Sequence, residues 1–227
     1  MTEPTRITID IWSDIMCPWC VVGYYQLQQA LAGLKGEIET EVRWHPFELN
    51  PDMGPEGEEF EAHIQRKYGR PLDPGLTARI QEMAAAAGHD MRYQGGEPEP
   101  ESRLWNTRLA HLLLHYTLMS HGPELQTRLK LALFDAHFQY RRNVSDPAVL
   151  LELATGAGLE ADEVSQVLAD ESLLAIVKAE EEDALGKGIH SVPAMVFAGR
   201  FMVPGAQSPE VYTDVLRKVA AKVNEVA

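Results

Sequence analysis

Two cysteines three positions apart are the most reactive pair of side chains in the sequence. The chain of 227 residues has two cysteines in all, and both lie in the segment Cys17-Pro18-Trp19-Cys20. A thiolate attacks disulfides, and a second thiol three residues away is placed to attack the mixed disulfide that results. The pair therefore predicts thiol-disulfide exchange, with Cys17 as the nucleophile and Cys20 as the resolving thiol.

The place of this pair at the start of a helix favours ionisation of Cys17. Proline is tolerated in the first turn of a helix, so Pro18 predicts a helix that begins there with Cys17 as its N-cap. A side chain at this position faces free backbone N–H groups, here those of Trp19 and Cys20, and the positive end of the helix dipole stabilises an anion. We expect the pKa of Cys17 to lie below the free-thiol value of about 8.5.

Two other roles for the cysteines are open on these residues alone. A C-x-x-C segment can form half of a zinc site, but a closed structural site needs four ligands and the chain has no third cysteine. Cysteines also occur as small, inert, buried hydrophobic residues. The predicted position of the motif between a strand and a helix argues against both roles.

The residues around the motif predict the first half of an α/β fold. Residues 7–11 alternate isoleucine with polar side chains, as a strand does, and residues 38–44 alternate again. Between them, leucines and alanines from about residue 21 to 34 have helical spacing. Strand, helix and strand form a βαβ unit, whose two strands we expect to be parallel.

The rest of the chain predicts helices, then a hairpin and a last helix. Glycine- and proline-containing breaks divide the middle segment into about six helices. A hairpin is predicted around Gly199, and Ser208 is the predicted N-cap of the last helix. The whole order is that of a thioredoxin-like βαβ…ββα core with a large all-helical insertion. We divide the chain accordingly into a core, residues 1–49 and 187–227, and a helical insertion domain, residues 50–186.

A second element of the predicted site is Ser191-Val192-Pro193, immediately before the hairpin. In thioredoxin-like folds the corresponding proline is cis and lies against the dithiol. A cis Pro193 leaves backbone groups of Val192 free to pair with an extended substrate segment. A trans proline at the start of an edge strand is the alternative for this residue taken alone. The cysteine motif and the strand order that follows favour the cis form.

Charge and composition exclude several classes of partner. The formal net charge is −14, so a phosphate backbone or an anionic membrane surface would be repelled. The sequence has no apolar run of the roughly 20 residues that a membrane helix needs, and no export signal follows Met1. No phosphate-binding glycine pattern follows a strand. We expect a cytoplasmic protein without a cofactor, whose partners are thiol- or disulfide-containing proteins or low-molecular-weight thiols.

Six segments carry a resemblance to a known family: SDIMCPWC (13–20), HPFELNP (45–51), NTRLAH (106–111), LFDA (133–136), SVP (191–193) and GAQ (205–207). Through them nearly the whole chain resembles the DsbA-like thioredoxin-fold oxidoreductases, and within these the cytoplasmic FrnE-type branch. The resemblance implies disulfide exchange activity and a helical insertion between the two halves of the core.

The chain departs from related proteins at two positions of the site. Periplasmic DsbA proteins have a histidine within the dithiol motif that stabilises the thiolate, whereas this chain has Trp19, so the resemblance implies a less oxidising couple. Thioredoxins have a buried acid six residues before the first cysteine, where this chain has Ile11. Asp14, Glu48 or water are then the candidates for the proton acceptor of the resolving thiol.

A pair of histidines has the spacing of metal ligands. His111 and His115 are separated by one helical turn, but no Glu follows His111 as in H-E-x-x-H and a third ligand is not identifiable. We interpret both as polar side chains in a helical interface and predict no metal site. The family resemblance offers a different role, in which Asn106 and His111 line the cleft that faces the dithiol.

Two rival functions remain beside redox exchange. Glutathione-dependent 2-hydroxychromene-2-carboxylate isomerases and kappa-class glutathione transferases share this core and insertion, but they typically have serine where Cys17 stands. Such a serine needs no second thiol three residues away, so Cys20 favours redox chemistry. The other rival is a binding module or holdase that uses the cleft without chemistry.

Overall fold

A four-stranded sheet forms the centre of the protein, of which a computed structural model describes residues 3–71 and 73–225. The strands are β1 (Thr5–Ser13), β2 (Ile38–Pro46), β5 (Ala194–Phe197) and β6 (Phe201–Pro204). Their order in the sheet is β2-β1-β5-β6, with β1 and β2 parallel and the other two pairs antiparallel. The predicted α/β class and the parallel βαβ unit are confirmed.

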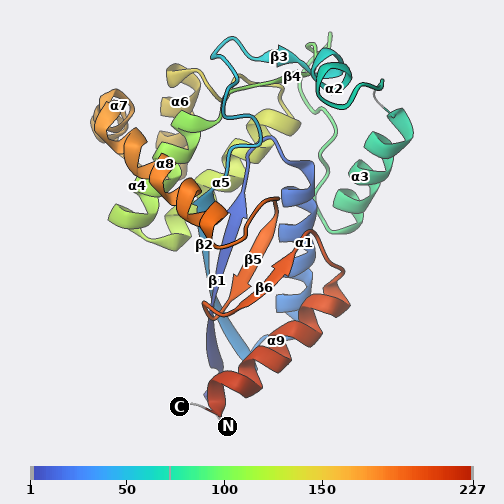
Figure 1. The fold of residues 1–227 in the computed structure, drawn as a ribbon, viewed down its shortest axis with the longest axis vertical. Coiled ribbons are helices and arrows are strands. Elements are labelled where there is room, and N and C mark those ends of the chain that lie inside the picture. The colour runs from blue at the N-terminus through green and yellow to red at the C-terminus, as the bar shows by residue number, and fades with distance from the viewer. Residues whose placement is uncertain (1–2, 72, 226–227) are drawn as a thin grey trace.

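Two helices of the core pack together on one side of this sheet. They are α1 (Pro18–Gly33), which connects β1 to β2, and α9 (Pro209–Asn224), which follows β6 (Figure 1). Ser208 caps α9 by accepting a hydrogen bond from the Val211 amide, and Pro209 occupies its first turn, as the sequence predicts. The thioredoxin-like order βαβ…ββα is therefore present in full.

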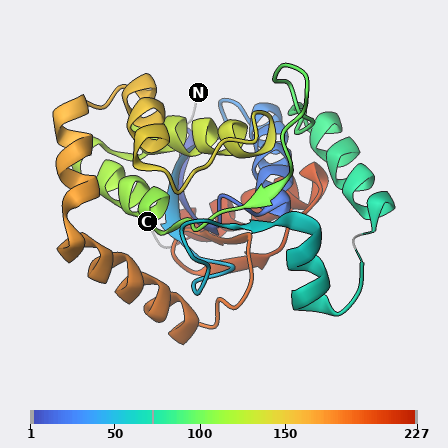
Figure 2. The ribbon, with the colours of Figure 1, turned by 90° about the horizontal axis from the view of Figure 1, so that it is seen from above.

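The segment between β2 and β5 is the helical insertion. Its described residues form α2 (Phe60–Tyr68), α3 (Pro74–Ala86), α4 (Arg108–His121), α5 (Pro123–Phe138), α6 (Pro147–Ala157), α7 (Ala161–Ala169) and α8 (Glu171–Gly186). A short second sheet pairs β3 (Glu58–Glu59) with β4 (Arg103–Leu104). Figures 1 and 2 show α2 and α3 on one side of the molecule and α6, α7 and α8 on the other.

The described part of the insertion has seven helices where the sequence predicts about six, because one helix boundary lacks glycine and proline. Asp170 ends α7 and is also the N-cap of α8, where its side chain accepts a hydrogen bond from the Ser172 amide. A carboxylate at this position satisfies free N–H groups at a helix start without any break in the apolar pattern. The β3–β4 pair was likewise not predicted.

Each helix in the described ranges is too short or too polar to traverse a bilayer.

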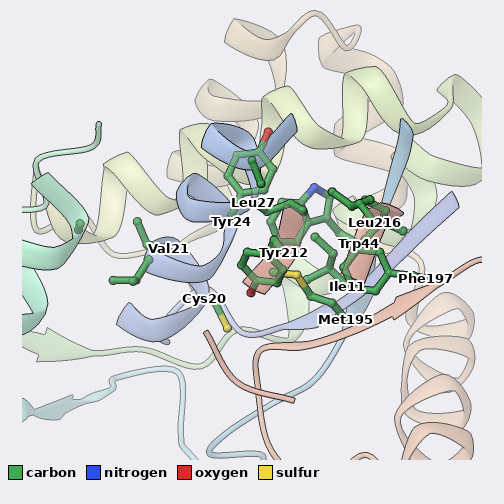
Figure 3. Close-up of a cluster of buried hydrophobic side chains, with 14 of the residues drawn as sticks. Ile11, Cys20, Val21, Tyr24, Leu27, Trp44, Met195, Phe197, Tyr212 and Leu216 are labelled. Carbon is green, nitrogen blue, oxygen red and sulfur yellow. The ribbon is translucent and has the colours of Figure 1, made fainter. Parts of the chain in front are cut away.

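The insertion packs directly against the core. The hydrophobic cluster around the sheet includes Ile7, Ile9 and Ile11 of β1 together with Ile80 of α3 and Phe134 of α5. Figure 3 shows side chains of β1, β2, β5, α1 and α9 meeting in this cluster, with Cys20 among them. A second cluster fills the space between α4, α5, α6 and α7. The division into domains at residues 49/50 and 186/187 stays a prediction.

One buried side chain joins the insertion to the edge of the sheet. Gln126 of α5 is fully buried, and its Oε1 accepts a hydrogen bond from the Trp44 amide of β2 at 2.9 Å. Its Nε2 donates to the carbonyl oxygens of Trp44 at 2.7 Å and Leu114 at 3.1 Å. Gln126 thus acts as a short substitute for a neighbouring strand, because it satisfies both polar groups of one edge residue.

Replacing Gln126 with leucine should destabilise the protein strongly. Gln126→Leu leaves the buried N–H and C=O of Trp44 without partners, at about 1–3 kcal/mol for each group, so we expect the free energy of unfolding to fall by about 2–6 kcal/mol. Urea unfolding measures this loss. The exposed Gln166 of α7 provides the control, and Gln166→Leu should change stability by less than about 0.5 kcal/mol. Equal effects of the two substitutions would refute the role of Gln126.

Candidate functional site: the buried dithiol

The first cysteine stands where β1 passes into α1. Cys17 is the N-cap of α1 and Pro18 occupies its first turn, which confirms the predicted helix start. The connecting loop is held by the buried Asp14, whose Oδ2 accepts a hydrogen bond from the Leu49 amide at 2.7 Å. The Cys17 amide in turn donates to the Asp14 carbonyl oxygen at 3.2 Å. These bonds fix the point at which the helix begins.

The two thiols are free, close together and almost completely buried. Cys17 is 4% exposed and Cys20 is 1% exposed. The Cys17 thiol donates a hydrogen bond to the Val192 carbonyl oxygen at 3.7 Å. The predicted capping contact from the Cys17 side chain to backbone amides is absent, and the Cys20 amide donates to the Cys17 carbonyl oxygen instead, at 3.1 Å. A neutral thiol is a weak acceptor, which explains why it donates to Val192 rather than capping the helix.

The two thiols of this reduced pair differ in how readily they ionise. The pKa of Cys17 is raised well above its ordinary value, mainly because of the adjoining Cys20 thiol and further because of burial. Burial also raises the pKa of Cys20, but hydrogen bonds from Cys17 and Ser13 and the charge of Lys130 outweigh this, so the pKa is lowered. The surroundings therefore favour ionisation of Cys20 over that of Cys17, which differs from the expectation that the helix start favours ionisation of Cys17.

The Val192–Pro193 segment lies against the start of α1. The peptide bond between these residues is cis, and the Pro193 carbonyl oxygen accepts a hydrogen bond from Gly205 at 2.7 Å. Gly23 of α1 permits this contact, because a Cβ at Gly23 would lie 3.2 Å from Pro193 Cγ and 3.4 Å from Ala206. Sequence reasoning missed Gly23, which resembles any glycine within a helix until its neighbours are known.

Of the other residues predicted for the site, three lie in or near the dithiol motif and one lies elsewhere. Trp19, 36% exposed, is the outermost residue of the motif, and Pro18 is half-buried beside it. His111 is buried with Nε2 3.6 Å from Asp14 Oδ1, so it reaches the loop that precedes the dithiol. Asn106 instead holds a loop of the insertion: its Nδ2 donates to the Met53 carbonyl oxygen at 2.8 Å.

The histidine pair does not share one partner. His111 faces Asp14, whereas His115 Nδ1 lies 3.0 Å from Glu180 Oε1. Within residues 3–71 and 73–225, no three side chains of His, Cys, Asp or Glu are grouped as a metal site requires. Both histidines are instead polar partners of carboxylates at helix interfaces.

Neither carboxylate considered as a proton acceptor is free of other partners. Burial raises the pKa of Asp14, but hydrogen bonding and charge from His111, the Leu49 amide and the charge of Lys130 outweigh this effect and lower the pKa below its usual value. Asp14 is therefore held as a carboxylate. Burial raises the pKa of Glu48, whose Oε1 also receives a hydrogen bond from Arg108 Nε at 3.1 Å.

A buried lysine near the dithiol was not predicted. Lys130 of α5 is fully buried, and its Nζ donates to the Ser13 carbonyl oxygen at 3.4 Å. The ammonium also lies over two aromatic rings, 4.8 Å from the centroid of Phe134 and 5.3 Å from that of Trp44. Burial lowers the pKa of Lys130 to about 8. The site thus contains a buried cation. From the sequence, Lys130 looked like an ordinary lysine of a predicted helix.

A buried histidine on the same helix should make the stability depend on pH. Burial lowers the pKa of His137 to about 3, so between about pH 6.5 and 3 the unfolded chain binds a proton that the folded protein does not. Stability therefore falls as the pH is lowered through this window, by about 1.4 kcal/mol per unit. From pH 7.5 to 5, we expect wild type to lose about 2 kcal/mol more than His137→Phe in urea unfolding.

The control for this comparison is His190→Phe, because His190 is exposed. That variant should lose as much stability between the two pH values as wild type does. If His137→Phe also follows wild type across the range, the neutral buried form of His137 is not responsible for the loss.

Comparison with known proteins identifies relatives of the whole fold. The sequence model of the DSBA-like thioredoxin domain family matches residues 8–217. A probable DsbA oxidoreductase from Streptomyces coelicolor has 32% sequence identity and superposes with a TM-score of 0.81, covering 93% of this chain and 89% of that one. The uncharacterized protein YwbO of Bacillus subtilis (strain 168) is 26% identical over 208 residues, which are 91% of this chain and 94% of that protein.

A more distant structure shows how widely this architecture is used. A 2-hydroxychromene-2-carboxylate isomerase superposes with a TM-score of 0.64 at 14% identity, covering 97% of this chain and 99% of that one. At this level of identity the likeness is one of fold, so the residues of the dithiol site have to decide the chemistry.

Proposed function

From the premise that this chain belongs to the DSBA-like thioredoxin domain family, we propose that it is a protein-disulfide oxidoreductase working through Cys17 and Cys20. The observation that carries the proposal is the contact of the Cys17 thiol, at the N-cap of α1, with the Val192 carbonyl oxygen, while Cys20 lies within hydrogen-bonding range. A nucleophile, a resolving thiol and a backbone edge for a partner thus meet at one point.

The first step of the exchange begins when Cys17 loses its proton. Transfer of this proton to Cys20, the thiol whose ionised form the site favours, leaves a thiolate at Cys17, the sulfur that adjoins Val192. This thiolate attacks one sulfur of a partner disulfide, a bond forms between Cys17 Sγ and that sulfur, and the other partner sulfur leaves as a thiolate. The product is a mixed disulfide with the partner.

The second step closes the protein's own disulfide. Cys20 loses its proton and attacks Cys17 Sγ, so the Cys17–Cys20 bond forms as the bond to the partner breaks. The partner disulfide has gained two electrons, and its two sulfurs become thiols by taking up the proton that Cys20 loses and one proton from water. The dithiol has lost two electrons. The same steps in reverse transfer a disulfide to a reduced partner.

The partners that fit this site are proteins or small molecules that contain thiols or disulfides. Extended peptide segments pair with exposed backbone edges, and the polar groups of Val192 offer such an edge beside Cys17. We place the exchange in the cytoplasm, where thiols are kept reduced, and the chain in the FrnE-like branch whose motifs it resembles. The division into a core and an insertion domain is part of the same proposal.

Serine substitutions of the two cysteines should have distinct effects. Cys17→Ser removes the nucleophile, so reduction of insulin by the protein, or oxidation of a model dithiol, should fall to the uncatalysed rate. Cys20→Ser keeps the nucleophile without the resolving thiol, so mixed disulfides with Cys17 should accumulate and be visible by mass spectrometry. Each variant controls for the other, because both lose one buried thiol.

Two outcomes would contradict the proposal. Exchange activity that survives in Cys17→Ser would show that Cys17 is not the nucleophile. A glutathione-dependent isomerase activity that survives in both variants would instead place the protein with the isomerases of this fold.

A further inference from the structure

Lys130, on a helix of the insertion, places its ammonium group near the dithiol. Ser13 lies close to both. Ser13, the last residue of β1, receives the hydrogen bond of Lys130 on its carbonyl oxygen at 3.4 Å. The buried Ser13 hydroxyl makes no hydrogen bond of good geometry among the described residues, but it lies near enough to Cys20 to lower the pKa of this thiol. Ser13 therefore lies between the cation and the sulfur.

The surroundings of Lys130 leave its charge incompletely compensated. A fully buried cation is costly unless an anion or hydrogen bonds compensate it. Its carbonyl contact and the faces of Trp44 and Phe134 give partial compensation. Asp14 is shared with His111, whose Nε2 lies 3.6 Å from Asp14 Oδ1.

The groups that act on the charge of Lys130 come from several elements around it. Cys20 acts most strongly among the charged groups, followed by Asp14 and then Cys17. His111 on α4 faces Asp14, and His137 follows Lys130 on α5 with its pKa lowered to about 3, so it is neutral at pH 7. The strongest negative partner of the ammonium is thus the dithiol itself.

We propose that Lys130 is a positioning residue for the redox reaction: its ammonium is the buried counter-ion of the thiolate that Cys17 and Cys20 share, and disulfide formation removes that counter-charge. The inference rests on the proposed function, since it assumes that this dithiol cycles between two redox states. It assigns to the insertion a direct part in setting the chemistry of the core.

Two consequences follow for the redox cycle. Because Lys130 stabilises the ionised dithiol and has no thiolate to face in the disulfide, it favours the reduced form and makes the couple more oxidising. When two electrons pass to a partner disulfide and the Cys17–Cys20 bond forms, the ammonium is left without this anion. Its pKa then falls, and a proton released to solvent can protonate the partner thiolate that has departed.

Replacement of Lys130 tests the electrostatic role. Lys130→Met keeps an unbranched side chain but removes the charge, so the acid dissociation constant of the first thiol, read from thiolate absorbance against pH, should fall about tenfold or more. The equilibrium with glutathione should move about tenfold toward the disulfide, which makes the reduction potential about 30 mV more negative. Lys130→Arg keeps a cation, so both values should stay within about threefold of wild type.

The matched control is Lys178→Met, because the Lys178 side chain is 77% exposed on α8. This variant should leave both the thiolate titration and the potential unchanged. If Lys130→Met also leaves them unchanged while urea unfolding shows it folded, or if Lys130→Arg behaves as Lys130→Met does, Lys130 is not the counter-ion of the thiolate.

A measurement on the wild-type protein tests the same inference without relying on the methionine variant. The Cε signal of Lys130 in ¹³C-lysine-labelled protein, assigned by its loss in Lys130→Arg, reports the ionisation of this side chain. We expect it to titrate at a higher pH in the reduced protein than in the disulfide form. Equal midpoints in both forms overturn the inference.

The outcome is separable from that of the proposed function. The titrations report ionisation and not turnover, so a reduced protein that fails to exchange with insulin still shows whether Lys130 senses the thiolate. Conversely, a protein that exchanges normally but whose Lys130 titrates identically in both forms retains its function without this inference.

Discussion

The antiparallel pairing of β1 with β5 is the constraint on which the site depends, because it sets where two distant parts of the chain meet. In its register Trp12 of β1 lies opposite Ala194 of β5, so the residues that follow Trp12 face those that precede Ala194. The loop that leads to Cys17 therefore meets Val192 and Pro193. A shift of the register by one residue would turn every side chain of the pair to the opposite face of the sheet. The buried isoleucines of β1 oppose such a shift, since their burial against α1 and α9 would be lost.

Much of this architecture is encoded locally and is therefore readable from the sequence. Alternating isoleucines predict β1, a proline in the first turn predicts the start of α1, and Ser208 predicts the cap of α9. Each of these signals acts within a few residues, where periodicity and capping are physical properties of the segment itself. The cysteine pair belongs to the same class, because its reactivity depends first on its own spacing.

The parts that could not be predicted depend on contacts between distant segments. Gln126 looks like any polar residue of a helix, yet it is buried against the edge of β2. Lys130 likewise follows a leucine on a predicted core helix, and its burial is set by Trp44 and Ser13. The expectation that Cys17 ionises more readily than Cys20 differs from the structure for the same reason. Pro18 and Cys17 mark the helix start correctly, but Cys17, Ser13 and Lys130 together lower the pKa of Cys20.

These contacts give the helical insertion a role beyond covering the sheet. Helix α5 contributes Gln126 and Lys130 four residues apart, on one face of the helix, so the same packing that satisfies the edge of β2 also carries a cation toward the cysteines. The thioredoxin-like core of this protein has the buried, apolar Ile11 at the position where thioredoxins have a buried acid that assists the resolving thiol. Within the β1–α1 unit, Ser13 and Cys17 act on the pKa of Cys20 through hydrogen bonds, and the positive charge that lowers this pKa comes from Lys130 on α5 of the insertion. Substitutions along this face of α5 therefore alter stability and thiol chemistry together, because both depend on how closely the helix packs against β2.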